Sequence, residues 1–527
     1  MAHRLHKAYT SSCQPALHPL RFTFLCVFLF GLIAHAFAFL NTNFSHDGLY
    51  VVQTDNEWQI SLGRVLQPVY RSLRGWFSAP WLLGLLSLLY IAVSAYLIIK
   101  LLDIRSRWGI TAVCGFLTVN ISITCLFATY MYCADTFLLA LLLAVWGVYV
   151  LRRYRFGFLL SAILFSCSMG LYQSYIAVAI TLLMILLIQD LLDSTPFRYV
   201  LVSACKSVGA LLFSALGYLL LMKLILLFTG ITPNDGYNTV TGVFDFQGIS
   251  IPHLFLNIYT YLANFFIRPK SFQPLSSVIV TFFLGGLAFC SLFGIIRRRR
   301  LKKFCTALLI VILCVLPLGI DFIFLLTKGW TIHHLMIYSF FLVFVFAIML
   351  YEKQRISADE AATRPLSLLK HGCVLLCCGI WFLNSIAYAN GAYLKKDMEE
   401  KAGLSLMTRV VDRMEQTEGY VAGETPVILI NSDYPGNAEL TAFDAYFQET
   451  GLEGTLPVTY YATYERYFQY ILQQPLLLLP ESTANEWAKR ETVAQMPAFP
   501  HTDSVQMIEG TLVIKLQENT ADNNAAS

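Results

Sequence analysis

The chain has 527 residues, of which 57% are hydrophobic and only 13% charged, and its formal net charge at pH 7 is +4. A soluble domain is usually close to a quarter charged, so this composition excludes a protein whose surface mostly faces water. No basic stripe with interleaved aromatic residues indicates nucleic-acid binding. The mean hydropathy of +0.61 instead predicts an integral membrane protein whose main partner is the lipid bilayer.

Apolar runs recur along the first 390 residues, many close to the ~20 residues that cross a bilayer. Each segment in lipid must satisfy its own backbone hydrogen bonds, so these runs are predicted to be helices. The first run, Phe22 to Leu40, is followed by no convincing cleavage site and is interpreted as an uncleaved span. The predicted fold class is mainly α, a polytopic helical membrane protein with about eleven spans: 22–40, 80–101, 109–130, 134–151, 156–171, 174–192, 199–229, 274–296, 304–326, 331–350 and 371–389.

Lysine and arginine are unevenly shared between alternate connections of these spans. One set of connections holds 21 of them and the other holds 6. Cytoplasmic loops carry the excess of positive charge, so the N-terminus is predicted in the cytoplasm and the C-terminus outside. The bias also favours two spans, rather than one, within 156–192.

Large external segments are predicted at 41–79, 230–273 and 391–527. Within the second, residues 252–267 suit a helix that lies in the membrane interface. The third is predicted to be an extracytoplasmic α/β domain that follows a transmembrane domain of residues 1–390. Its expected elements are an amphipathic helix at 396–416, a strand at 426–431, helices at 440–448 and 464–473, and a hairpin at 504–516.

The first external loop carries the densest group of chemically useful side chains. A carboxylate there can take the proton from an attacking hydroxyl, and a nearby cation can hold a departing phosphate. Asp47 is the best candidate for the base because it lies only a few residues past the membrane edge. The alternative is that these are ordinary loop charges that face water. The group consists of His46, Asp47, Asp55, Glu57, Arg64, Arg71 and Arg74.

Further candidates lie at the same predicted side of the membrane. Asp135 is interpreted either as the N-cap of the fourth helix or as a pocket residue. Tyr172 and Gln173 either satisfy two helix ends or bind sugar hydroxyls. Lys223 either snorkels to the interface or contacts a phosphate.

Lys328 and His334 form the last candidate group and could face a lipid phosphate. The adjacent pair His333-His334 is poorly arranged for one metal ion, because neighbouring helix residues point about 100° apart. No metal ligand set is therefore assigned.

Three segments carry a resemblance to a known family. They are His46-Asp47 followed by Gly63-Arg64, the turn SMGLYQSYIAV from Ser168 to Val178, and the exit NGAYLKKDMEE…TRVVDRME that leads to PVILIN. The chain resembles, over nearly its whole length, the bacterial GtrII family of glucosyltransferases, within the GT-C class of multispan enzymes. The resemblance implies a polyprenyl-phosphate-linked glucose donor and a cell-surface polymer acceptor. It also leads us to expect two adjacent acidic residues where this chain has His46-Asp47.

The combined hypothesis is a glycosyltransferase of the bacterial cytoplasmic membrane that inverts the sugar in a single displacement. In this hypothesis Asp47 is the base, with Asp55 or Glu57 as the alternative. The sequence has no nucleotide-binding signature, which agrees with a lipid-linked donor. No cofactor is assigned, and assistance by a divalent cation stays open. A transporter or flippase of lipid-linked sugars is the alternative function, and a non-catalytic scaffold is a third.

Overall fold

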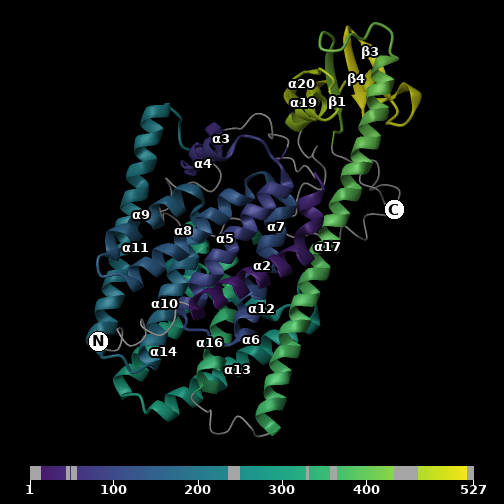
Figure 1. Cartoon of the computed structure of the whole chain (residues 1–527). Coiled ribbons are helices and arrows are strands. Elements are labelled where there is room, and N and C mark those ends of the chain that lie inside the picture. Colours follow the sequence, from purple (N-terminus) through teal and green to yellow (C-terminus); the bar gives the residue numbers. More distant parts are fainter. Residues whose placement is uncertain are drawn as a thin grey trace. The chain divides into compact units, whose positions relative to one another are not determined.

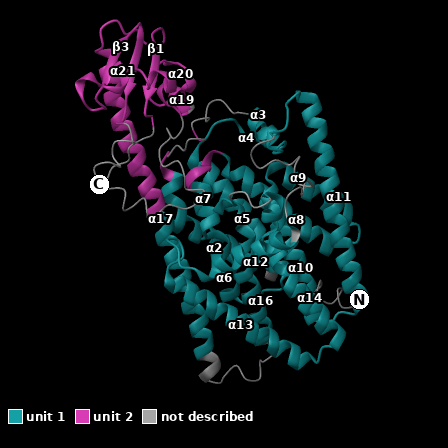
Figure 2. Cartoon of the chain, turned by 180° about the vertical axis from the view of Figure 1, so that it is seen from behind, with its two compact units in different colours: residues 1–39, 55–127, 133–390 teal, residues 40–54, 128–132, 391–527 magenta. Residues whose placement is uncertain are grey.

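The structure is a computed structural model that describes residues 14–42, 48, 56–234, 250–327, 332–356, 365–432 and 461–518. It is mainly helical, with a small strand-containing region near the C-terminus (Figure 1). The chain forms two compact units (Figure 2). Unit 1 comprises residues 1–39, 55–127 and 133–390, and unit 2 comprises residues 40–54, 128–132 and 391–527.

Eight of the described helices are long and apolar enough to cross a membrane. A ninth candidate is a pair of helices bent by 42°, α6 (Arg107–Thr118) and α7 (Ile121–Thr129). The predicted class of helical membrane protein is therefore confirmed. The eight are α2 (Gln14–Leu40), α5 (Pro80–Leu101), α8 (Ala134–Arg153), α10 (Ile176–Leu192), α11 (Phe197–Thr229), α13 (Leu275–Arg299), α14 (Lys303–Ile320) and α17 (Pro365–Glu415).

Two predicted spans correspond to shorter helices of 15 residues each. The span 156–171 agrees with α9 (Gly157–Leu171), whereas the span 331–350 only overlaps α16 (Leu342–Ile356). Eleven crossings therefore stay a prediction. The division of 156–192 into two helices is confirmed, because α9 ends at Leu171 and a 3₁₀ turn, η3 (Gln173–Tyr175), precedes α10.

Short helices of unit 1 occupy the connections between the long ones. The helix predicted at 252–267 is confirmed as α12 (Ile251–Ile267), while its interfacial position stays a prediction. The other short helices of unit 1 are α3 (Asn56–Ser61), α4 (Gln67–Arg74), α15 (Phe322–Thr327) and the 3₁₀ turns η4 (His334–Met336) and η5 (Tyr338–Phe341). The 3₁₀ turn η2 (Met131–Cys133) precedes α8, and its first two residues belong to unit 2.

The helix that leads into the candidate site, α8, packs against both α5 and α9. Small residues permit this close packing. A Cβ atom on Gly147 would lie 2.5 Å from the ring of Phe165 on α9, which is closer than side chains tolerate. Helices α8 and α9 therefore pack closely around Gly147.

Unit 2 contains a four-stranded sheet of order β2-β1-β4-β3. The central strand β1 (Pro426–Ile430) pairs in parallel with β2 (Leu477–Leu478) and β4 (Thr511–Lys515), and β3 (Val505–Ile508) pairs antiparallel with β4. The predicted strand and hairpin are thus confirmed. The hairpin turns at Glu509 and Gly510, both with positive φ (49° and 76°), as expected for a two-residue hairpin loop.

The helices of unit 2 were predicted in part. The helix expected at 464–473 is α19 (Tyr461–Tyr470), and the one expected at 396–416 is the end of α17 rather than a separate helix. The helix expected at 440–448 lies outside the described residues. Elements that the sequence did not reveal are β2, α20 (Glu481–Trp487) and α21 (Glu491–Ala494).

Candidate functional site

A cavity of about 500 Å³ opens within unit 1. Most of its wall is apolar and comes from α10, α11 and α15, including Ile180, Leu212, Ala215 and Leu326. Polar groups come from a few positions only, Arg64, Gln173, Ser174, Tyr218 and Thr327 among them. We call this cavity the lipid-side groove. None of the lining residues comes from α12.

Arg64 lines the lipid-side groove and is half-buried. Its Nη1 donates a hydrogen bond to Gln59 Oε1 at 3.1 Å. Its guanidinium carbon lies 5.1 Å from the ring centre of Tyr172 and 5.4 Å from that of Phe137, and those two rings stack on each other at 3.9 Å. The aromatic pair thus stabilises the Arg64 guanidinium by cation–π contacts. The other N–H groups of this guanidinium can donate hydrogen bonds to a ligand.

Gln173 and Tyr218 fasten the loop that carries Arg64. Gln173 Nε2 donates to the carbonyl oxygen of Leu62 at 2.9 Å and to the Tyr218 hydroxyl at 3.0 Å. The Tyr218 hydroxyl donates to the carbonyl oxygen of Gly63 at 2.9 Å. The predicted residues Arg64, Tyr172 and Gln173 therefore meet at one place, and Gln173 both binds the loop and lines the groove.

The next segment, α4, is held by the same turn. The backbone N–H of Leu66 donates to the Gly170 carbonyl at 2.9 Å, and Gln67 Nε2 donates to the Leu171 carbonyl at 3.0 Å. These bonds satisfy carbonyls at the C-terminal end of α9, which have no partner within their own helix. The segment from Ser168 to Val178 is thus a docking point for the connection between α2 and α5.

Asp135 is fully buried in the first turn of α8. Its Oδ2 lies 2.9 Å from Arg74 Nε in an ion pair and accepts a hydrogen bond from the Tyr70 hydroxyl at 3.0 Å. The interpretation as an N-cap is wrong, because Cys133 occupies that position and makes no side-chain cap bond. The carboxylate is instead bound by two side chains of α4.

Tyr70 is suited to donate to this carboxylate. Its hydroxyl lies 3.0 Å from that of Tyr90 on α5. Burial, followed by the negative charge of Asp135, raises the pKa of Tyr70. The phenol therefore keeps its proton and can satisfy Asp135 at any physiological pH.

The remaining predicted residues are spread more widely. Glu57 is exposed in the first turn of α3. Lys223 is exposed on α11, one turn beyond the groove residue Leu219. His334 is buried, with its ring centre 5.1 Å from that of Phe272. Four predicted residues lie outside the described part of the chain: His46, Asp47, Asp55 and Lys328.

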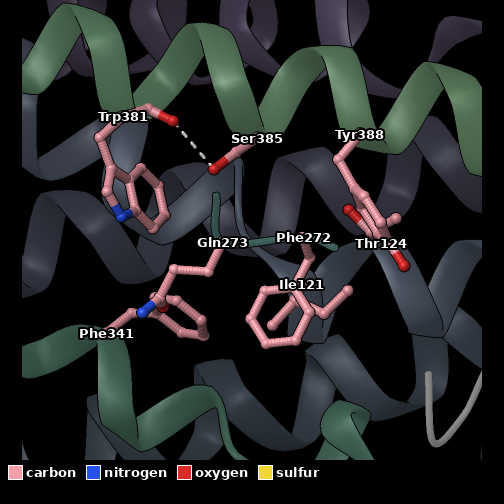
Figure 3. A pocket seen from close by; sticks show the side chains of 8 residues that line it. All are labelled: Ile121, Thr124, Phe272, Gln273, Phe341, Trp381, Ser385 and Tyr388. Carbon is pink, nitrogen blue, oxygen red and sulfur yellow. Dashed lines mark hydrogen bonds between the residues drawn. The ribbon is translucent and has the colours of Figure 1, made fainter. Parts of the chain in front are cut away.

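A second cavity, of about 10 Å³, lies beside α17 (Figure 3). Gln273, Phe341 and Trp381 line it, and its volume matches at most a single water molecule. Gln273 Nε2 donates to the carbonyls of Phe265 and Phe266 at the end of α12. This cavity is therefore a packing gap around a helix cap and is too small for a sugar.

Some residues of the site were missed from the sequence. Tyr218 lies in an apolar run and Tyr70 in a segment rich in charge, so no pattern distinguishes them. Arg74 was named only as one of the cations of that segment, and its pairing with Asp135 was not foreseen. Phe137 is also missed, because an aromatic residue in a membrane helix is ordinary. Within the described ranges, no three His, Cys, Asp or Glu side chains are placed to hold a metal ion.

Comparison with known proteins gives one match. The model of a protein family described as glucosyl transferase GtrII matches residues 36–344. No curated protein and no solved structure matches the chain. The matched range contains the whole lipid-side groove and every residue of the network around Asp135.

Proposed function

Because this chain belongs to the GtrII family of glucosyl transferases and is a membrane glycosyltransferase, we propose that it moves glucose from a polyprenyl-phosphate carrier to a cell-surface polysaccharide or cell-wall polymer. The site lies on the outer side of a bacterial cytoplasmic membrane, with the N-terminus in the cytoplasm and the C-terminal unit outside. The uneven charge of the connecting loops supports this orientation.

The lipid-side groove is the observation that carries the proposal. Its volume of about 500 Å³ lies within the usual range for ligand pockets. Its wall is apolar along α10 and α11, whereas Arg64, Gln173 and Tyr218 gather at one place. A donor that joins a hydrocarbon chain to a phosphate and a sugar is likewise apolar along one part and polar at one end. A free sugar or a nucleotide sugar would leave the apolar wall unused.

Arg64 binds the phosphate of the donor in this proposal. Guanidinium groups form strong paired hydrogen bonds with phosphate, and the aromatic rings of Tyr172 and Phe137 hold this one in place. Lys223, Lys328 and His334 are secondary candidates for the same phosphate. Tyr172 and Gln173 shape the place where the sugar sits.

The reaction is a single displacement with Asp47 as general base, and with Asp55 or Glu57 as the alternative. An acceptor hydroxyl oxygen attacks the anomeric carbon and forms the new glycosidic bond. The bond from that carbon to the phosphate oxygen breaks, and polyprenyl phosphate leaves with the bonding electrons. The carboxylate takes the hydroxyl proton. Attack opposite to the leaving phosphate inverts the anomeric centre.

Replacement of Asp47 by asparagine tests this proposal. Loss of a general base typically costs about 10²–10⁴ in rate, so release of polyprenyl phosphate from polyprenyl-phosphate-glucose, with envelope polymer present, should fall by that factor. Binding of the donor should stay unchanged. Arg155→Ala is a suitable control because Arg155 is exposed and remote in sequence from the groove lining.

The other outcomes separate the alternatives. A scaffold is indifferent to Asp47→Asn in every assay. A flippase moves the lipid-linked sugar across proteoliposomes without any transfer to an acceptor. Either result contradicts the proposed reaction.

A further inference from the structure

Asp135 binds two residues of α4 at once. The ion pair with Arg74 and the hydrogen bond from Tyr70 both reach the same oxygen, Oδ2, at 2.9 and 3.0 Å. The Asp135 and Arg74 side chains are 0% and 5% exposed. A carboxylate that is buried and bound in this way has no free approach for a sugar.

The segment that Asp135 holds is the one that carries Arg64. The Arg64 carbonyl accepts a hydrogen bond from the backbone N–H of Gln67, the first residue of α4, at 3.1 Å. Arg64 is therefore joined directly to the start of the helix whose residues 70 and 74 are bound to Asp135.

The same turn of α8 reaches Arg64 by a second route. Phe137 follows Asp135 by two residues, and its ring lies 5.4 Å from the Arg64 guanidinium carbon. The first turn of α8 thus contacts one end of the 64–74 segment through Phe137 and the other end through Asp135. A short segment held at both ends keeps one orientation.

From this geometry we infer that Asp135 is a positioning residue, which holds α4 through Arg74 and Tyr70 so that Arg64 faces the phosphate of the lipid donor. The inference rests on the proposed function, and it gives Asp135 a different role from a sugar-binding or proton-transferring group. Asp135 acts on the donor only through Arg64.

A double-mutant cycle tests the inference, with binding of polyprenyl phosphate and of the uncharged polyprenol of equal length as the two measurements. Arg64→Ala should weaken the binding of polyprenyl phosphate about tenfold or more, because a charge-assisted contact is lost. Asp135→Asn should weaken the binding of polyprenyl phosphate severalfold, and Asp135→Glu should weaken this binding less than Asp135→Asn does. The double variant should bind no more weakly than Arg64→Ala alone, because coupled residues are not additive. Polyprenol binding should stay the same in the wild-type protein and in every one of these variants.

Several results would overturn the inference. Additive effects of Arg64→Ala and Asp135→Asn would show that Asp135 acts independently of Arg64. If the binding of polyprenol were weakened as much as the binding of polyprenyl phosphate, the variants would have general damage to the fold. If Asp135→Asn fails to fold, Tyr70→Phe removes the hydroxyl contacts with Asp135 Oδ2 and with Tyr90 and should reproduce the selective loss at smaller size. No selective loss in Tyr70→Phe would then contradict the inference.

Failure of the proposed function gives a different pattern. If the wild-type protein binds polyprenyl phosphate no better than polyprenol, or if Arg64→Ala has no effect, then Arg64 is not a phosphate ligand and both ideas fail. If Arg64→Ala has its selective effect and Asp135→Asn has none, only the positioning role is lost.

Discussion

Two buried carboxylates of unit 1, Glu352 and Asp135, differ in their surroundings. Glu352 of α16 accepts hydrogen bonds from the N–H groups of Arg105 and Ser106 at 2.7 and 2.9 Å, and from the Ser106 hydroxyl at 2.8 Å. Asp135 binds Arg74 and Tyr70.

The partners of the two carboxylates explain the difference. Glu352 binds backbone groups at the N-terminus of α6, where a helix has unpaired N–H groups and favours a negative charge. Asp135 binds side chains of a short helix that leads to a cavity. The first arrangement closes a helix end, whereas the second orients a segment beside a groove. Burial of a carboxylate alone therefore does not indicate a functional role. The role is indicated by the segments to which the partners of the carboxylate belong.

The largest expected effect is a loss of stability on replacement of Glu352. Glu352→Ala leaves two N–H groups and one hydroxyl without their acceptor, and we expect a loss of about 3 kcal/mol of unfolding free energy. The KM for the lipid donor should not change. Thermal unfolding in detergent, together with initial rates, measures both quantities.

The exposed Glu481 in unit 2 provides a matched control, because Glu481→Ala should change neither quantity. A raised KM in Glu352→Ala, without loss of stability, would contradict the distinction between the two carboxylates.

The membrane fold was largely predictable because the signals are local. Long apolar runs and the charge of their connections locate the helices, and Glu-Gly between two alternating runs locates the hairpin of unit 2. The 15-residue helix α16 shows the limit of this reasoning, because the span predicted at 331–350 begins with the 3₁₀ turns η4 and η5. A run of apolar residues does not reveal where a helix gives way to a 3₁₀ turn.

The candidate site was predictable only in part. Arg64, Tyr172 and Gln173 were identified because each is a polar or aromatic residue near a predicted membrane edge. Asp135 was identified, but its partners were not, because contacts between residues 70, 74 and 135 depend on how α4 packs. Tyr218 carries no local signal within its apolar helix, and only the folded structure brings its hydroxyl to Gly63.

The second effect concerns the apolar part of the lipid-side groove, which Glu352 does not line. Ala215→Phe places a ring in the groove wall, and overpacking of this kind costs about 1–3 kcal/mol. We expect the KM for a long-chain polyprenyl donor to rise roughly tenfold, while a donor with a very short lipid chain is less affected.

Leu216→Phe is the matched control for Ala215→Phe. Leu216 is the next residue on α11, is 65% exposed and does not line the groove. If both variants raise the KM equally, the effect comes from α11 as a whole, and the groove is not the place of the lipid chain.

The smallest effect separates the loop from the groove itself. Tyr218→Phe keeps the ring in the groove wall but removes the hydroxyl that accepts from Gln173 and donates to Gly63. Loss of such hydrogen bonds costs about 1 kcal/mol, so the KM for the lipid donor should rise about fivefold. The stability should fall by a similar amount at most. Tyr199→Phe is the control, because the Tyr199 hydroxyl is exposed and accepts a hydrogen bond from the exposed Arg198 side chain. Since the Tyr218 hydroxyl acts by fixing the loop that carries Arg64, the added effect of Tyr218→Phe should be smaller in an Arg64→Ala background. An undiminished effect there would mean that the hydroxyl contacts the donor directly.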